Sequence, residues 1–204
     1  MDSINKLIEI FEDFPGIGPR QAKRFVYFLL TRNANFLNSF GDNIKSLKNL
    51  INVCSSCQRF YQKDASQENV CSICRNVNRN KETLMVVSRD IDLEQMEKAH
   101  CFDGMYFVLG GTIPILEKEP ERRIRAKELI AKIKDMQKNN LTEIIIATSL
   151  NPEGENTADY VEKIIKQELG DGIKITTLGR GLSTGTELEY SDSETLKNAI
   201  KNRQ

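Results

Sequence analysis

The apolar residues near the N-terminus recur at intervals of three and four residues, the spacing of an amphipathic helix. This pattern predicts a first helix over residues 3–13, with Ser3 as its N-cap. Proline and glycine interrupt it in residues 15–19, so a second helix is expected to begin at Pro19, and a third covers 41–52. The expected inward side chains are Ile4, Leu7, Ile8 and Phe11, then Ala22, Phe25, Val26 and Leu29, then Ile44, Leu47, Leu50 and Ile51.

From about residue 82 the pattern changes to short apolar runs that alternate with amphipathic stretches. Four runs are expected to be strands: Leu84–Val87, Met105–Leu109, Ile144–Ala147 and Ile173–Thr176. Helices are expected over residues 93–99, 121–139, 155–169 and 193–202. Strands and helices in alternation predict an α/β domain with a mostly parallel sheet and flanking helices.

The composition is that of an ordinary globular chain, with 204 residues, 39 % of them hydrophobic and 28 % charged. No apolar run approaches the roughly 20 residues of a membrane span. The first residues also lack the basic region and long apolar run of a signal peptide, which favours a cytoplasmic protein. The net charge is zero, but residues 1–80 hold eleven basic and seven acidic residues. This mild excess of positive charge hints at an anionic partner for the N-terminal part.

Four of the five cysteines form two C-x2-C pairs, Cys54 with Cys57 and Cys71 with Cys74. Two such pairs, thirteen residues apart, predict a closed tetrahedral site of four sulfurs, which suits one Zn²⁺ per chain. Four protein ligands leave no position for water, so the metal is expected to be structural. The alternatives are two disulfides, which need an oxidising compartment, or iron on the same thiolates. Cys101, the fifth, is expected to be a small core residue.

The segment Phe14-Pro15-Gly16-Ile17-Gly18-Pro19-Arg20 lies between two predicted helices, which is the pattern of a helix-hairpin-helix. Glycines let the backbone approach a phosphate, and N–H groups at the start of the second helix can donate to it. Such contacts go to the DNA backbone, so binding is expected to be independent of sequence. The alternative is a plain turn with its basic residues on a solvated face. The candidate DNA-binding residues are Gly16, Ile17, Gly18, Arg20, Lys23 and Arg24.

The order of hairpin, four-cysteine module and α/β domain resembles the bacterial recombination mediator family RecR. Residues 147–158 resemble its acidic N-P-T-x-E-G-E-A-T loop, and residues 180–190 resemble its R-G-x-P-x-G-x-x-L-E-Y segment. The resemblance implies that the α/β part is a Toprim domain, the fold shared with topoisomerases and primases. With a boundary near residue 80, the expected domains are a helix-hairpin-helix region (1–53), a zinc module and linker (54–80), a Toprim-like domain (81–178) and a C-terminal segment with a helix (179–204).

The resemblance also implies a non-enzymatic role in recombinational DNA repair. Protomers would form a ring-like tetramer that encircles single- or double-stranded DNA, with the hairpins lining its inside. The Toprim domains would meet RecO-like and RecF-like partners, and the complex would help load the recombinase RecA onto single strands. Glu153, Glu155 and Arg180 are candidates for partner or DNA contacts. Such a protein would act in the bacterial cytoplasm, at the nucleoid.

Some residues depart from the family pattern. The first Toprim strand ends in Val87-Ser88, where relatives usually keep a glutamate that acts in acid–base chemistry. A serine hydroxyl, with a pKa far above 7, cannot replace that carboxylate. Ser149–Pro152 and Ser183 also differ from the family motifs. Glu153 and Glu155 could hold Mg²⁺ or simply favour the start of a helix. Because Ser88 replaces the glutamate of the first strand, Mg²⁺ is not expected at this loop.

Two rival functions remain open at this stage. The first is a Toprim-type metal-dependent nuclease or primase-like enzyme, and the second is a zinc-module adaptor that binds only proteins. The sequence has no G-x-x-x-x-G-K-[ST] loop, so the chain is not expected to hydrolyse ATP alone. His100, the one histidine, has no cysteine or carboxylate at ligand spacing and is expected to be solvated or at the edge of the core.

Overall fold

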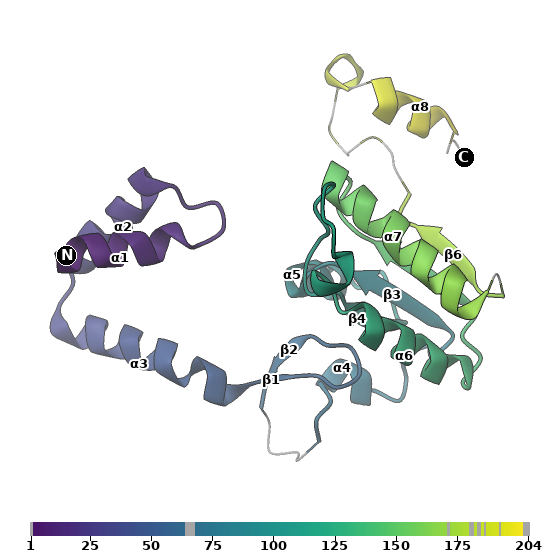
Figure 1. Ribbon diagram of the computed structural model, residues 1–204, viewed down its shortest axis with the longest axis horizontal. Helices are drawn as coiled ribbons and strands as arrows, with labels where there is room; N and C mark the ends of the chain where they lie inside the picture. Colours follow the sequence, from purple (N-terminus) through teal and green to yellow (C-terminus); the bar gives the residue numbers. More distant parts are fainter. Residues whose placement is uncertain are drawn as a thin grey trace. The chain divides into compact units, whose positions relative to one another are not determined.

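The structure is a computed structural model, and it describes residues 2–63, 68–170, 172–179, 182, 185, 187–191 and 193–201. The chain divides into two compact units, residues 1–51 and 52–204, which Figure 1 shows in the colours of the sequence. None of the helices in the described ranges is long and apolar enough to cross a bilayer.

The first unit holds three helices, α1 (Ser3–Glu12), α2 (Pro19–Leu30) and α3 (Ala34–Leu50). Helices α1 and α2 pack around Ala22 and Val26, which are fully buried. The ring of Phe11 extends this contact, because it lies edge-on to Phe25 with 5.6 Å between ring centroids. Asp2, not Ser3, caps α1, because the Asp2 carboxylate accepts the N–H of Ile4. Leu7, expected to face inward, is 39 % exposed.

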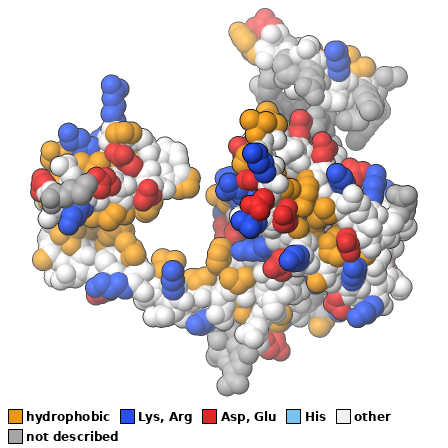
Figure 2. All heavy atoms as spheres, viewed as in Figure 1, with side chains coloured by type: hydrophobic (Ala, Val, Ile, Leu, Met, Phe, Trp, Pro, Cys, Tyr) orange, Lys and Arg blue, Asp and Glu red, His pale blue; other side chains and the backbone are white. Residues whose placement is uncertain are grey.

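Helix α3 departs further from the prediction. It begins at Ala34 and not at residue 41, because the side chain of Asn33 accepts the N–H of Phe36 at 2.9 Å and caps the helix there. It also ends earlier than expected, since Ile51 already belongs to strand β1 (Ile51–Val53). The side chains expected to be buried are instead half exposed or more: Ile44 55 %, Leu47 56 % and Leu50 51 %. Figure 2 shows apolar side chains on the surface of α3, so this helix presents an open apolar face in the single chain.

The second unit is built on a parallel sheet of four strands in the order β4-β3-β5-β6. The strands are β3 (Thr83–Val87), β4 (Met105–Val108), β5 (Glu143–Ala147) and β6 (Lys174–Thr177), and each end lies within one residue of its predicted position. In this register Val86 lies beside Phe107 on one neighbouring strand and Ile146 on the other. The predicted α/β fold is therefore confirmed.

Both faces of the sheet are covered at β3 and β4, which explains why these strands read as continuous apolar runs, whereas β6 is partly exposed and more polar. Helices α6 (Ala126–Gln137) and α7 (Pro152–Leu169) bury one face, against alternate residues such as Leu84, Val86 and Phe107. The opposite face, with Met85 and Tyr106, packs on α5 (Asp90–Ala99) and on the cysteine module. The module contributes strand β2 (Phe60–Gln62), which pairs with β1, and the short helix α4 (Ser72–Arg75).

Three predicted helices of this unit begin elsewhere, and of these α5 begins at Asp90, three residues before its predicted start. The stretch predicted as a helix over residues 121–139 is a 3-10 turn, η1 (Pro120–Arg122), followed by α6, because the N–H of Arg125 donates to Leu109 at 2.9 Å and turns the chain back to the sheet. Helix α7 begins at Pro152, since the side chain of Asn151 accepts the N–H of Gly154 at 2.8 Å. The described C-terminal part holds η2 (Leu188–Tyr190) and α8 (Ser193–Lys201).

Candidate DNA-binding hairpin and four-cysteine centre

The four cysteines of the two C-x2-C pairs meet in space. All their sulfur atoms lie within 4.8 Å of one another, and those of Cys57 and Cys71 are 3.6 Å apart. A tetrahedral centre with metal–sulfur bonds of about 2.3 Å has sulfur–sulfur distances of about 3.8 Å. Cys54, Cys57 and Cys71 are buried and Cys74 is partly buried. The donor set, its spacing and its burial therefore fit one metal ion held by four thiolates.

Local backbone geometry aims the sulfurs at one point. Gln58 adopts a left-handed conformation with φ 63°, and its N–H donates to the backbone carbonyl of Cys54, which closes the first cysteine pair into a tight turn. Cys71 caps α4, and its N–H donates to the sulfur of Cys54 at 3.3 Å. The crowded thiols cannot all ionise alone. Contact with Cys57 lowers the pKa of the Cys54 thiol, and the same contact raises the pKa of Cys57. A divalent cation would allow all four to be thiolates.

The cysteine module is fixed to the sheet of the same unit. The N–H of Val108 donates to the carbonyl of Cys57 at 2.8 Å, and the N–H of Phe60 donates to the carboxylate of Asp90 at 2.7 Å. Ile73 of α4 packs in the same apolar cluster as Met85 of the sheet. Any metal held here therefore sits against the second face of the sheet.

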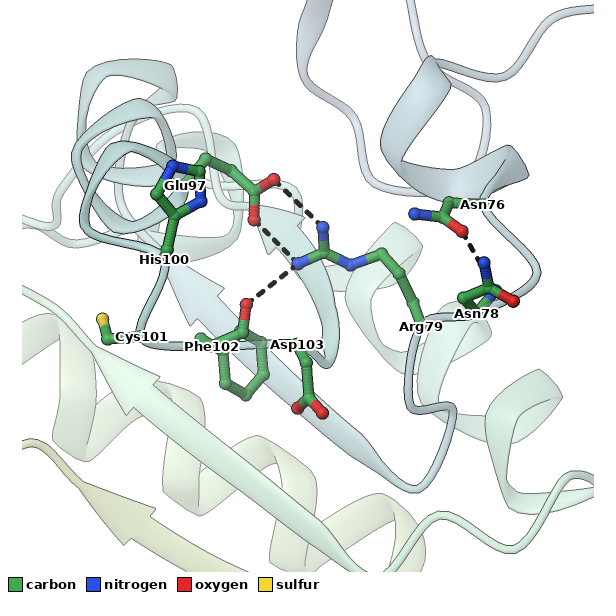
Figure 3. Close-up of a pocket in the computed structure, with 8 residues that line it drawn as sticks. All are labelled: Asn76, Asn78, Arg79, Glu97, His100, Cys101, Phe102 and Asp103. Atoms are coloured by element: carbon green, nitrogen blue, oxygen red, sulfur yellow. Dashed lines mark hydrogen bonds and ion pairs between the residues drawn. The ribbon is translucent and has the colours of Figure 1, made fainter.

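Arg79, in the linker that follows the module, lines a pocket of about 490 Å³ together with Glu97 of α5, toward which its side chain points (Figure 3). Its guanidinium donates two hydrogen bonds to the carboxylate of Glu97, at 2.7 and 3.0 Å. It also donates to the carbonyls of Gly104 and Phe102 and lies 5.3 Å from the ring centroid of Tyr106. Burial is the largest single influence on the pKa of Glu97 and would raise it, but the hydrogen bonds and positive charge of Arg79, with smaller contributions from Tyr106 and Arg59, together lower that pKa. This clamp fixes the linker to the α/β domain.

The same pocket is bordered by His100 and Cys101, shown in Figure 3. His100 ends α5 in a left-handed conformation with φ 50° and is exposed, as expected for a solvated histidine. The prediction that Cys101 is a core residue is wrong, because its side chain is exposed. Phe102 turns inward instead, with its ring edge-on to Tyr106 at 5.1 Å.

The predicted hairpin is a tight turn between α1 and α2. Gly16 has φ +76°, which an L side chain rarely adopts, and the N–H of Ile17 donates to Phe14 at 3.0 Å. Gly18 is the N-cap of α2, and apart from its chain neighbours no atom lies within 4 Å of where a Cβ at this position would be. The start of α2 is therefore open to a ligand that approaches the backbone.

The three predicted basic residues, Arg20, Lys23 and Arg24, are exposed on α2, away from the buried Ala22 and Val26. Arg24 donates one long hydrogen bond of 3.4 Å to Gln21. In the part of the chain that the structure describes, none of the three forms an ion pair with a carboxylate. Their positive charges are therefore available to an external anion.

The carboxyl end of β3 holds Ser88, which is 1 % exposed and whose hydroxyl has no hydrogen-bond partner within the described ranges. The order of the strands reverses at β3, and enzymes of this architecture bind ligands at such a point. Glu153 and Glu155 are exposed in the first turn of α7, and Glu153 accepts a hydrogen bond from Thr112 at 3.1 Å. Arg180 lies outside the described residues. Among those described, the four cysteines are the one group of three or more metal-ligating side chains.

Sequence reasoning missed the Arg79 clamp and two further cations, Arg125 and Lys132. Arg125 donates to the carbonyl of Gln58, and Lys132 donates to the hydroxyl of Ser56 at 2.6 Å. Each pair is separated by more than sixty residues in sequence, so no local periodicity could indicate it.

Three parts of the chain match known domain families. Residues 4–47 match the helix-hairpin-helix of RecR, residues 82–179 match the Toprim domain, and residues 181–204 match the C-terminal part of RecR. These matches lie on either side of the cysteine module, in the order in which the motifs occur.

Full-length relatives agree with these matches. The chain is 36 % identical over 203 residues to the recombination protein RecR of Latilactobacillus sakei, which covers 100 % of this chain and 97 % of that protein. It is also 36 % identical to the proteins of the same name from Lactococcus lactis (strain MG1363) and Dehalococcoides mccartyi, over 99 % of this chain and 96 % and 94 % of those proteins.

Proposed function

The chain belongs to the RecR family of recombination proteins, and on that basis we propose that it is a sequence-independent DNA-binding mediator of recombinational repair. Its family gives it a role in recombination, and a Toprim domain alone does not imply catalysis here. Ser88, buried where Toprim enzymes use a glutamate, argues against the nuclease or primase-like alternative.

The observation that carries the DNA-binding proposal is the open hairpin with its exposed cations, which form no ion pair within the described residues. Gly16 and Gly18 keep the start of α2 clear of side chains, and Ile17 lies between them in the turn. Arg20, Lys23 and Arg24 surround this backbone with positive charge. Since every phosphate group of DNA offers the same contacts, the hairpin would hold DNA without reading bases.

We assign Cys54, Cys57, Cys71 and Cys74 as ligands of one structural Zn²⁺ per chain. When bound, the metal would supply positive charge to the thiolates and join the two cysteine pairs. The chain itself provides the rest: tight turns that aim the sulfurs, and the sheet on which the module packs. The metal would thus brace the α/β domain and take no part in a reaction.

The family also supports an assembly. We propose that protomers form a ring-like tetramer around DNA in the bacterial cytoplasm, at the nucleoid, and act with RecO-like and RecF-like partners to promote RecA loading. The open apolar face of α3 supports association of copies, because an exposed apolar surface of this kind is normally covered. Glu153, Glu155 and Arg180 are our candidates for contacts with partners or DNA.

The test is the salt dependence of DNA binding. Each lost phosphate contact lowers the slope of log affinity against log salt by about 0.9 for duplex DNA. The double variant Arg20→Ala with Arg24→Ala is therefore expected to have a slope smaller by about 1.8, so that a fourfold rise in salt costs it about 12-fold less affinity than the parent.

The matched control is Lys6→Ala with Lys48→Ala, which removes two exposed cations of the same unit outside the hairpin. The control is expected to keep the parental slope. A hairpin variant with the slope and affinity of the parent would refute the DNA-binding assignment.

A further inference from the structure

Two cations of the α/β domain reach into the loop of the first cysteine pair. The ammonium group of Lys132, on α6, donates to the hydroxyl of Ser56 at 2.6 Å. The guanidinium of Arg125, which precedes α6, donates to the carbonyl of Gln58 at 2.8 Å and to that of Val108 at 3.2 Å. Both contacts are partly buried, and the residues contacted in the loop, Ser56 and Gln58, lie on either side of Cys57 in the sequence.

The direction in which Lys132 points is informative. Glu128 and Asp135 lie on the same helix at the spacing of helical ion pairs, and they line the same groove of about 370 Å³ beside Ser56. Within the described ranges Lys132 nevertheless makes no ion pair with either carboxylate, and Arg125 makes none with any. The two positive charges are thus directed to the cysteine loop.

The charge of the metal centre explains why the two cations would point to the cysteine loop. Four thiolates and one divalent cation carry a net charge of −2, and burial of such a charge is costly unless neighbouring groups offset it. Outer residues that hold a metal ligand in place typically change metal affinity 10- to 100-fold when they are removed. Two cations next to the Cys54–Cys57 loop match the charge that has to be offset.

We propose that Lys132 and Arg125 are positioning residues of the metal centre. They hold the first cysteine pair against the sheet and offset the charge of the metal–thiolate group, and so they determine how tightly the chain retains its metal. The second cysteine pair depends on the first, because Cys71 donates its N–H to the sulfur of Cys54 and Asn69 accepts the N–H of Ser55. This proposal rests on the assignment of the four cysteines as a metal site.

The experiment measures metal retention by the purified full chain. Metal content is determined first, and the rate of Zn²⁺ transfer to a chromogenic chelator is then compared between the parent, Lys132→Met and Arg125→Gln. Each variant is expected to lose its metal about 10-fold faster than the parent. Lys127→Met is the matched control, because Lys127 is exposed on the same helix and makes no hydrogen bond or ion pair with the module within the described residues.

Two further variants separate charge from packing. Lys132→Arg keeps the charge and is expected to restore most of the retention, whereas Ser56→Ala removes the hydrogen bond and keeps the charge, so it is expected to lose metal only slightly faster. In Co²⁺-loaded protein, the thiolate-to-metal absorption reports the centre directly, and it is expected to disappear at lower chelator concentration in Lys132→Met than in Lys127→Met.

The outcomes are distinguishable. A parent chain without about one metal per chain would refute the metal site itself, and this proposal with it. A parent that holds its metal, with Lys132→Met and Arg125→Gln no faster than Lys127→Met, would overturn only the role of these two cations. Retention as poor in Lys132→Arg as in Lys132→Met would show that shape, not charge, matters at this position and would also overturn it. DNA binding at the hairpin tests the mediator proposal separately.

Discussion

Replacement of Arg79 by methionine tests the clamp between the linker and the α/β domain. Methionine keeps an apolar stem of similar length but removes the guanidinium, and with it two hydrogen bonds to Glu97 and two to backbone carbonyls. The side chain of Arg79 is 10 % exposed, so water cannot replace these bonds fully. The side chain of Glu97 is 30 % exposed and regains part of its hydration.

The size of the effect follows from this burial. Removal of one partner of a buried ion pair costs about 3–5 kcal/mol, and the partial exposure of Glu97 places Arg79→Met near the lower end, about 3 kcal/mol. Glu97→Gln leaves a neutral acceptor opposite Arg79 and should cost less, about 1–2 kcal/mol. In a unit of this size, 3 kcal/mol corresponds to a fall in Tm of about 6–12 °C.

The assay is thermal unfolding of the full chain, followed by far-ultraviolet circular dichroism in buffer that contains Zn²⁺. The chain has no tryptophan, so the backbone signal is the natural probe. A fall in Tm below about 3 °C for Arg79→Met would refute the reasoning, because it would mean less than about 1 kcal/mol. Simple additivity of Arg79→Met and Glu97→Gln in the double variant would refute it as well, since residues in direct contact are expected to be coupled.

Other predictions concern pH, metal and the hairpin. Because folding lowers the pKa of Glu97, the ionised carboxylate stabilises the folded chain above its ordinary pKa of 4.5, and this stabilisation is lost as the pH falls through the folded-state pKa. Acid titration followed by circular dichroism should therefore destabilise Glu97→Gln less than the parent. Cys71→Ser should lower both the metal content and the Tm, because a structural metal contributes folding energy, and an intact Tm after metal loss would contradict this. Gly16→Ala should destabilise the hairpin by about 1 kcal/mol, because Gly16 has a positive φ. Gly18 has φ −91° and open space around it, so Gly18→Ala should be nearly neutral in thermal unfolding. Equal effects of the two substitutions would contradict the turn geometry.

Features that depend on local sequence could be predicted. The strands were found because burial on both faces makes them continuous apolar runs, as in Leu84–Val87. The cysteine spacing and the P-G-I-G-P-R turn likewise depend on residues that are close in sequence. From these local patterns the α/β fold and the four clustered cysteines could be predicted.

Features that depend on distant partners could not be predicted. Periodicity shows that Ile44 and Leu47 share a helix face, but it does not show what covers that face, and in the single chain it is open. The pairing of Arg79 with Glu97 joins residues eighteen apart in the sequence, in a linker and a helix that have no common period. Of the adjacent residues Cys101 and Phe102, which follow α5, the ring of Phe102 packs against Tyr106 and the side chain of Cys101 is exposed. The sequence does not show which of two adjacent apolar residues points inward.

The bond from Val108 to Cys57 also has a consequence for solubility. Strand β4 is one of the two outermost strands of its sheet, and an outermost strand with free N–H and carbonyl groups is a template for pairing with another chain. The carbonyl of Cys57 occupies one such N–H group and places the cysteine module beside the strand. We expect loss of the metal to loosen the module and uncover this strand, so light scattering should rise after chelation. We therefore expect the module to shield this edge of the sheet as well as to hold a metal.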